Sequence, residues 1–168
     1  NACTLQSALT IAVSGDEIWV AAGIHKPTTG SDREATFELK NGVAVYGGFA
    51  GTETAREQRD FVANATILSG DLNGDDIGFS NNAENVYHVV SGVSGSTLDG
   101  FTITAGNANV GNSCPDTACG GGMFLWGNSP TISNVVFSGN SAKFGGGLFT
   151  NSDANPMLTN VTFVGNTA

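Results

Sequence analysis

The sequence predicts an all-β fold in which the chain winds as a parallel β-helix, a solenoid of short strands, behind a short N-terminal capping helix. Two observations predict this class. An internal repeat with an offset of 25 to 26 residues lies near the C-terminus, and runs of alternating apolar and polar residues recur along the chain. Self-similarity at such an offset is typical of stacked repeat architectures. Alternation at period two is typical of half-buried strands.

The repeat comprises residues 120–144 and residues 145–168. Neither unit contains a run with helical periodicity, so we expect each unit to form one coil of strands. Equivalent side chains of successive coils then stack about 4.8 Å apart. The expected columns pair Met123 with Leu148, Phe124 with Phe149, Val135 with Val161, Phe137 with Phe163, Asn134 with Asn160, and Asn140 with Asn166.

The composition fits many turns between short strands. Glycine occurs 24 times, and only 12% of the residues are charged. Glycine permits the sharp bends of a coil, and asparagine tolerates left-handed backbone at corners. Upstream of the repeat, strand-like runs occupy residues 17–21, 35–39, 43–47, 66–69, 86–90 and 97–103.

The first residues differ from the rest of the chain. Thr4 is a good N-cap for a short amphipathic helix, whose apolar positions are residues 5, 8, 9 and 12. We assign residues 1–16 to an N-terminal cap and residues 17–168 to the coils. A cap of this kind would cover the open edge of the first coil.

The last coil ends where another Gly-Gly-Gly unit is due. This position predicts that the coils continue beyond Ala168 or that the open C-terminal coil self-associates.

The formal net charge of −9 excludes some partners. An acidic chain is repelled by phosphate backbones, so we expect no nucleic-acid binding. No run of 18 apolar residues is present, which predicts no transmembrane helix. No N-terminal signal-peptide pattern is present either, as expected for a processed secreted chain.

The three cysteines bear on the compartment. Cys114 and Cys119 flank a short loop that contains a proline. We favour a disulfide between them, which implies an oxidising environment, over a metal clip or free thiols. Cys3 is left without a partner in the sequence.

Two stretches of the chain resemble known families. In residues 120–168, Gly121-Gly122-Met123 and Gly146-Gly147-Leu148 alternate with Phe137-Ser138-Gly139-Asn140 and Phe163-Val164-Gly165-Asn166. This alternation resembles the repeats of chlamydial-type polymorphic outer membrane proteins, where GG[AIL] alternates with FxxN, although Met123 departs from the first element. The stretches SGDEIWVAAGIHKPT, LKNGVAVYGGFAGTET, TILSGDLNGDD and LDGFTIT resemble large bacterial secreted proteins with right-handed, pectate-lyase-like β-helices.

The resemblance implies a right-handed β-helix that is secreted or displayed at the cell surface, with an adhesive or structural role. It implies no particular activity. We therefore expect an extracellular or cell-surface location.

The groups that catalysis requires are sparse. Lyases of this fold use carboxylates and a basic Arg or Lys, and polygalacturonase-type hydrolases use convergent carboxylates beside a His. The chain has six Lys and Arg residues, and no Gly-His-Gly or Arg-x-Lys element accompanies Asp75 and Asp76. We therefore assign no catalytic residue and favour a non-enzymatic role.

The best candidate for a metal site is the run from Asp71 to Asp76, whose proposed ligands are Asp71, Asn73, Asp75 and Asp76. Oxygen ligands at alternate positions of a turn suit Ca²⁺. The run is similar to the start of an EF-hand loop, but Asp76 replaces the glycine and Asn82 replaces the final glutamate. The alternative is a solvated turn held by side-chain to backbone bonds.

Trp126 is the best candidate for stacking on a sugar ring, because it stands beside Gly127 and Asn128. The alternative is a packing role, which is commoner for aromatic residues.

Together these features predict a structural or adhesin-like β-helix that can assemble into rods or filaments and that contacts glycans or other cell-surface polymers. The alternatives are a carbohydrate-active module of the polysaccharide lyase or hydrolase type and a glycan-binding module.

Overall fold

The computed structural model describes residues 3–114, 117–151 and 153–168. The described chain is mostly β, with one short α-helix, α1 (Leu5–Ile11), and one 3-10 turn, η1 (Arg56–Gln58). The strands are β1 (Glu17–Ala21), β2 (Gly23–His25), β3 (Phe37–Glu38), β4 (Ala44–Phe49), β5 (Thr66–Ser69), β6 (Val90–Ser91), β7 (Thr97–Thr104), β8 (Asn107–Ala108), β9 (Met123–Leu125), β10 (Thr131–Ser138), β11 (Ser141–Ala142), β12 (Leu148–Thr150) and β13 (Met157–Val164).

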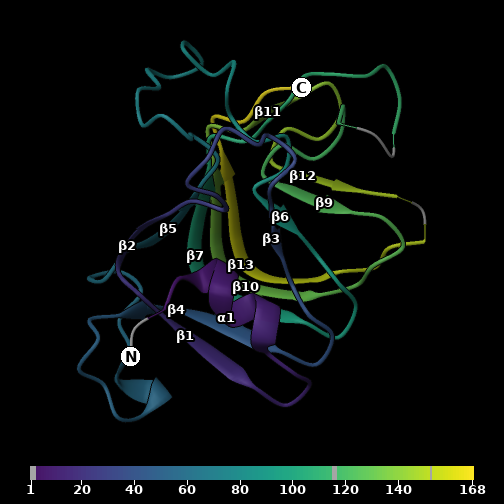
Figure 1. Cartoon of the computed structure of the whole chain (residues 1–168). Coiled ribbons are helices and arrows are strands. Elements are labelled where there is room, and N and C mark those ends of the chain that lie inside the picture. The colour runs from purple at the N-terminus through teal and green to yellow at the C-terminus, as the bar shows by residue number, and fades with distance from the viewer. Residues whose placement is uncertain (1–2, 115–116, 152) are drawn as a thin grey trace.

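The strands form three sheets, and every pairing between the named strands of the described chain is parallel (Figure 1). The largest sheet has seven strands, with β1-β4-β7-β10-β13 as its path and with β2 and β5 attached. A four-stranded sheet has the order β12-β9-β6-β3, and β8 pairs with β11 in a third sheet. The predicted all-β class and the short N-terminal helix are thus confirmed.

From β7 onward the chain visits the three sheets in a fixed rotation. The strands β7, β10 and β13 belong to the seven-stranded sheet, β8 and β11 to the two-stranded sheet, and β9 and β12 to the four-stranded sheet. Parallel neighbours require a long crossover between them, and here each crossover contains the short strands of the other two sheets.

The register predicted from the repeat is confirmed. Met123 pairs with Leu148, and Phe124 pairs with Phe149. Val135 pairs with Val161, one residue further along than in the first pair of strands. The rings of Phe137 and Phe163 stack with their centroids 4.9 Å apart.

The core lies between the sheets and follows the alternation of the strands. Leu98, Ile132 and their neighbours turn the same face inward and are fully buried, whereas Ser133 and Val136 between them are partly exposed. One connected cluster of buried side chains reaches from Leu5 of α1 to Phe137 of β10.

Asparagine shapes the corners, as predicted. Asn134 and Asn160 have a φ of 51°, a left-handed conformation that asparagine adopts more readily than most residues. Their amides form a ladder, because Asn160 Nδ2 donates to Asn134 Oδ1 at 2.7 Å and Asn134 Nδ2 donates to Asp99 Oδ1 at 2.8 Å.

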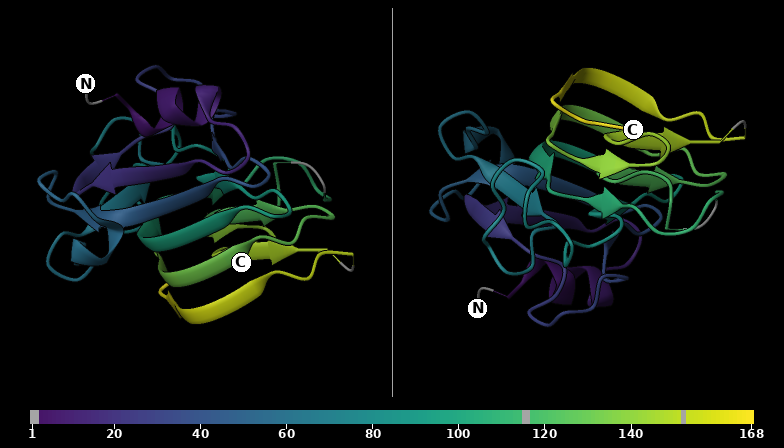
Figure 2. Two further views of the ribbon diagram at one scale, coloured as in Figure 1. Left: turned by 90° about the horizontal axis from the view of Figure 1, so that it is seen from below. Right: turned by 90° about the horizontal axis from the view of Figure 1, so that it is seen from above.

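The helix α1 lies across the N-terminal end of the seven-stranded sheet, at the end opposite β13 (Figure 2). Thr4 Oγ1 accepts a hydrogen bond from Ser7 N at 3.1 Å, as expected of an N-cap. Leu5 and Leu9 are buried against the core. Apolar burial therefore holds this short helix in place, since an isolated helix of its length would not be stable.

Candidate metal centre

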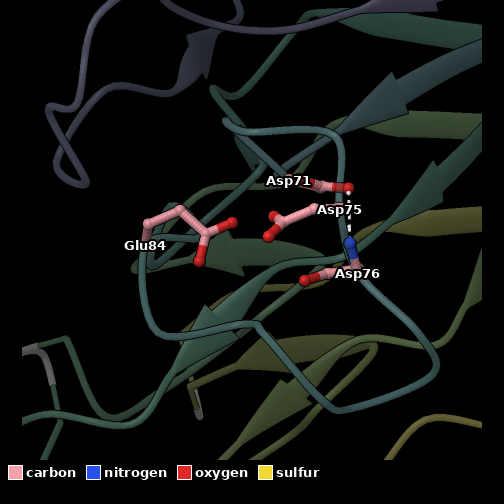
Figure 3. A group of neighbouring side chains, drawn as sticks. All are labelled: Asp71, Asp75, Asp76 and Glu84. Carbon is pink, nitrogen blue, oxygen red and sulfur yellow. Dashed lines mark hydrogen bonds between the residues drawn. The ribbon is translucent and has the colours of Figure 1, made fainter.

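Four carboxylates meet in the long connection between β5 and β6. Each of Asp71, Asp75, Asp76 and Glu84 offers an oxygen, and these oxygens all lie within 4.8 Å of one another (Figure 3). The connection leaves the sheet after Ser69 and returns at Val86, whose backbone N–H donates to the carbonyl of Gly70 at 3.0 Å. This bond closes the base of the connection and sets its two arms side by side.

Asp71 organises the first arm. Its Oδ1 accepts from the backbone N–H of Gly74, and its Oδ2 accepts from that of Asp76 at 3.3 Å (Figure 3). Gly74 has a φ of 81°, which a residue without Cβ adopts without strain. This Asx-type turn directs Asp75 and Asp76 toward the second arm.

Asn85 and Glu84 form the second arm. Asn85 is only 1% exposed, and its Nδ2 donates to Asp76 Oδ2 at 2.7 Å. Its backbone carbonyl accepts from Arg33 Nε at 2.6 Å. Arg33 also stacks on the ring of Tyr87, with the guanidinium carbon 4.2 Å from the ring centroid. The second arm is therefore fixed to the body of the protein.

The four carboxylates lack a counter-charge. None of the ion pairs among the described residues includes them. Lys26, which is near Gly74, donates instead to the carbonyl of Leu72 at 3.1 Å. Burial raises the pKa of Asp76 above its usual value, and the nearby charges of Asp71, Glu84 and Asp75 raise it further, against the lowering effect of the Asn85 hydrogen bond.

Three buried oxygens at this place have no hydrogen-bond partner. They are Asp76 Oδ1, Glu84 Oε1 and Asn85 Oδ1. Buried oxygens are nearly always satisfied by a donor or a cation. Carboxylate and amide oxygens are the ligands that hard divalent cations prefer. The cluster can therefore hold a metal ion.

The predicted ligand set is partly brought together. Asp71, Asp75 and Asp76 lie in the cluster, while Asn73 is an exposed residue of the same turn. Glu84 and Asn85 were missed, because they follow the turn by eight residues or more and only the closure at Gly70 brings them back. Their signal in the sequence is an acid next to an amide directly before a buried apolar run, in a chain with few charges.

The predicted disulfide is confirmed. Cys114 and Cys119 are bonded, with their Cα atoms 5.8 Å apart, and Cys3 is an exposed free thiol. The bond closes a loop between β8 and β9, next to the buried Ala118.

Trp126 lies on the outer surface of the four-stranded sheet and is 44% exposed. Its ring stacks on that of Phe124 at 6.3 Å between centroids, and Phe124 also stacks on Phe149 at 5.9 Å. The two rings line a shallow hollow of about 280 Å³ together with Glu38 and Asn128.

The arginines are engaged in contacts that hold the sheets and loops. Arg59 bonds to Asp99 at 2.9 Å, and both side chains are largely buried. Arg56 bonds to Glu17 at 2.7 Å.

Comparison of the chain with protein-family models, with curated proteins and with solved structures found no match. Among the residues that the structure describes, no helix is long and apolar enough to cross a membrane.

Proposed function

We propose that the chain is a right-handed parallel β-helix in which the three sheets are the faces of one coil. The fixed rotation of the chain through the three sheets from β7 to β13 carries this proposal. Parallel strands joined by crossovers are right-handed in nearly all proteins. The resemblance of the repeats to pectate-lyase-like and polymorphic outer membrane proteins supports the same reading.

The function that fits this fold best is that of a non-enzymatic structural or adhesin-like module, located outside the cell or on its surface. The Cys114–Cys119 bond supports an oxidising environment. Ladders of parallel hydrogen bonds and a stacked core make a rigid support for attached loops. Such a module would contact glycans or other cell-surface polymers.

Incubation of the purified chain with acidic and neutral polysaccharides separates this role from the carbohydrate-active alternative. We expect retention of the chain on at least one insoluble polymer and no release of new chain ends. Release of new ends, at a rate that scales with protein concentration, would establish an enzyme instead.

Calcium binding by the acidic cluster is a second function that a specific observation favours. The three unpartnered buried oxygens beside uncompensated carboxylates carry it. In this reading Asp71, Asp76 and Glu84 hold Ca²⁺ between the two arms, and the ion fastens the connection onto the body of the protein.

Calorimetric titration of chelator-treated protein with Ca²⁺ alone tests this function. We expect saturable binding that is lost in the double variant Asp71→Ala, Asp75→Ala. Removal of the exposed Asp153, which lies in another loop, is the matched control and leaves binding unchanged. Equal heats for both variants would show that the cluster is not the site.

Glycan binding on the hollow beside Trp126 is the remaining alternative, supported by the stack of Trp126 on Phe124. Replacement of Trp126 by alanine should abolish retention on the bound polymer. The same change at Trp19, which is 39% exposed on another sheet, is the control.

A further inference from the structure

The outermost strand of the seven-stranded sheet, β13, exposes apolar side chains that its neighbour buries. Leu158 is 42% exposed and Phe163 is 49% exposed, whereas their partners on β10, Ile132 and Phe137, are fully buried. Among the described residues, β10 is the one strand that pairs with β13, so the other edge of β13 has free backbone groups. The core of the molecule is therefore open at this end.

This edge lacks the features that usually protect exposed strands. Natural proteins place charges, prolines or bulky covers on such edges to prevent pairing with other chains. Residues 154–168 contain no Asp, Glu, Lys or Arg, although the whole chain carries a net charge of −9. The strand Met157–Val164 contains no proline. The rest of the surface repels a second copy, and this face alone does not.

The opposite end of the molecule is closed by α1. Leu5 and Leu9 pack against the core there, and the helix contacts β1 and β3 (Figure 2). A second copy therefore cannot place its N-terminal end on β13 unless α1 is displaced. Two copies can cover their open ends together only by placing β13 against β13, around a two-fold axis.

We propose that β13 is a docking surface for a second copy of this chain and that the product is a closed two-fold dimer with the two β13 strands antiparallel. A register centred between Asn160 and Val161 matches like with like. It sets Leu158 opposite Phe163 of the partner subunit and Thr159 opposite Thr162 of the partner subunit. The apolar side chains of both copies then continue one core, and the free backbone groups of both edges pair.

Analytical ultracentrifugation over a wide range of protein concentrations tests the proposal. We expect a reversible dimer of twice the chain mass of 17.1 kDa. The double variant Thr159→Lys, Thr162→Lys changes two exposed residues and sets lysine opposite lysine in the proposed register, so the dimer is lost while the circular dichroism of the monomer is unchanged. The matched control, Ser31→Lys with Thr52→Lys, adds the same charge at exposed positions of other loops and keeps the dimer.

Three results would overturn the proposal. A wild-type chain that stays monomeric at its highest soluble concentration shows that the face does not bind a second copy. Growth beyond the dimer into rods shows that the assembly is not closed. A dimer that survives the β13 lysines but is lost in a Thr10→Lys variant of α1 places the interface at the other end.

Discussion

Asn140 connects three segments of the chain through a single buried amide. Its Oδ1 accepts from Gly106 N at 3.0 Å, and its Nδ2 donates to Ile103 O and to Asn166 Oδ1, each at 2.9 Å. The side chain is fully buried, so no water replaces these bonds when they are lost. Polar groups left unpaired in a core destabilise a fold more than exposed ones.

We therefore expect Asn140→Ala to lower the free energy of unfolding by about 2–3 kcal/mol, since it leaves the Gly106 N–H and the Ile103 carbonyl without partners. Urea denaturation of the purified chain measures this. Asn134→Gly is the control, because it keeps the left-handed backbone and removes an amide that is only partly buried. A smaller effect for Asn140 than for Asn134 would contradict the role given to burial.

Asp76 gives the acidic cluster a pH dependence. The pKa of Asp76 is raised in the folded protein, chiefly by burial, so folding favours its protonated form. Its contribution to stability is present below the ordinary pKa of the carboxyl and is lost as the pH rises through the raised value. Ca²⁺ requires the ionised form, so its apparent affinity should fall as the pH is lowered through that same range.

The variant Asp76→Asn tests this at the level of one group. Without metal we expect the variant to be more stable than the wild type at neutral pH and to lose the pH dependence just described, while it retains an acceptor for Asn85. With Ca²⁺ present the order reverses, because a ligand is missing. Thermal unfolding at several pH values, with chelator and with Ca²⁺, measures both effects. A variant less stable than the wild type in chelator would refute the sign.

At the scale of elements, the glycine triplets set how closely neighbouring segments approach. A Cβ on Gly121 would lie 2.2 Å from the carbonyl oxygen of Ser141, and Gly146 has a backbone carbonyl equally near. Backbone cannot move aside as a flexible side chain can. The strands that follow these triplets, β9 and β12, depend on this approach for their pairing.

Gly121→Ala should therefore destabilise the protein by about 3 kcal/mol, at the upper end of the usual cost of overpacking. Gly30→Ala is the control, because the nearest atom to its Cβ is a threonine hydroxyl at 3.6 Å in a loop. Guanidinium denaturation of both variants provides the comparison. Equal midpoints would show that the sheets can separate to accept a methyl group.

The elements also show which parts of the fold a sequence can reveal. The strands β7, β10 and β13 share one register, and β10 and β13 are separated by a nearly constant offset, so an alignment of the chain with itself finds their partners. The run of residues 86–90 was expected to be a strand, but β6 is only Val90–Ser91, because the backbone N–H of Tyr87 bonds to Arg33 in an insertion rather than to a strand. Insertions of unequal length hide such partners.

The same reason divides the candidate site. Asp71, Asp75 and Asp76 follow one another in a single turn, and a local pattern identifies them. Glu84 and Asn85 join them through the return of the connection to Gly70, which is a tertiary contact that no local pattern encodes.

At the scale of the whole molecule, one core joins two unlike ends. The end at α1 is covered, and the end at β13 is open. If α1 is what limits assembly to a dimer, then loosening it should expose the edges of β1 and β3 to the β13 face of another copy. Head-to-tail contacts that do not close grow without limit.

The double variant Leu5→Ala, Leu9→Ala should weaken the attachment of α1 by removing its two buried leucines, at a cost of about 2–5 kcal/mol for each. We expect this variant to form assemblies longer than the dimer, visible as rods by electron microscopy and as slow species in light scattering. Ile11→Ala, a change at a helix residue that is 77% exposed, should leave the dimer as it is. Adding the β13 lysines to the leucine variant should remove the rods, because both kinds of contact use β13. Rods that persist with those lysines would mean that the open end is not the growing surface, whereas a folded leucine variant that remains dimeric would mean that α1 is not the element that stops growth.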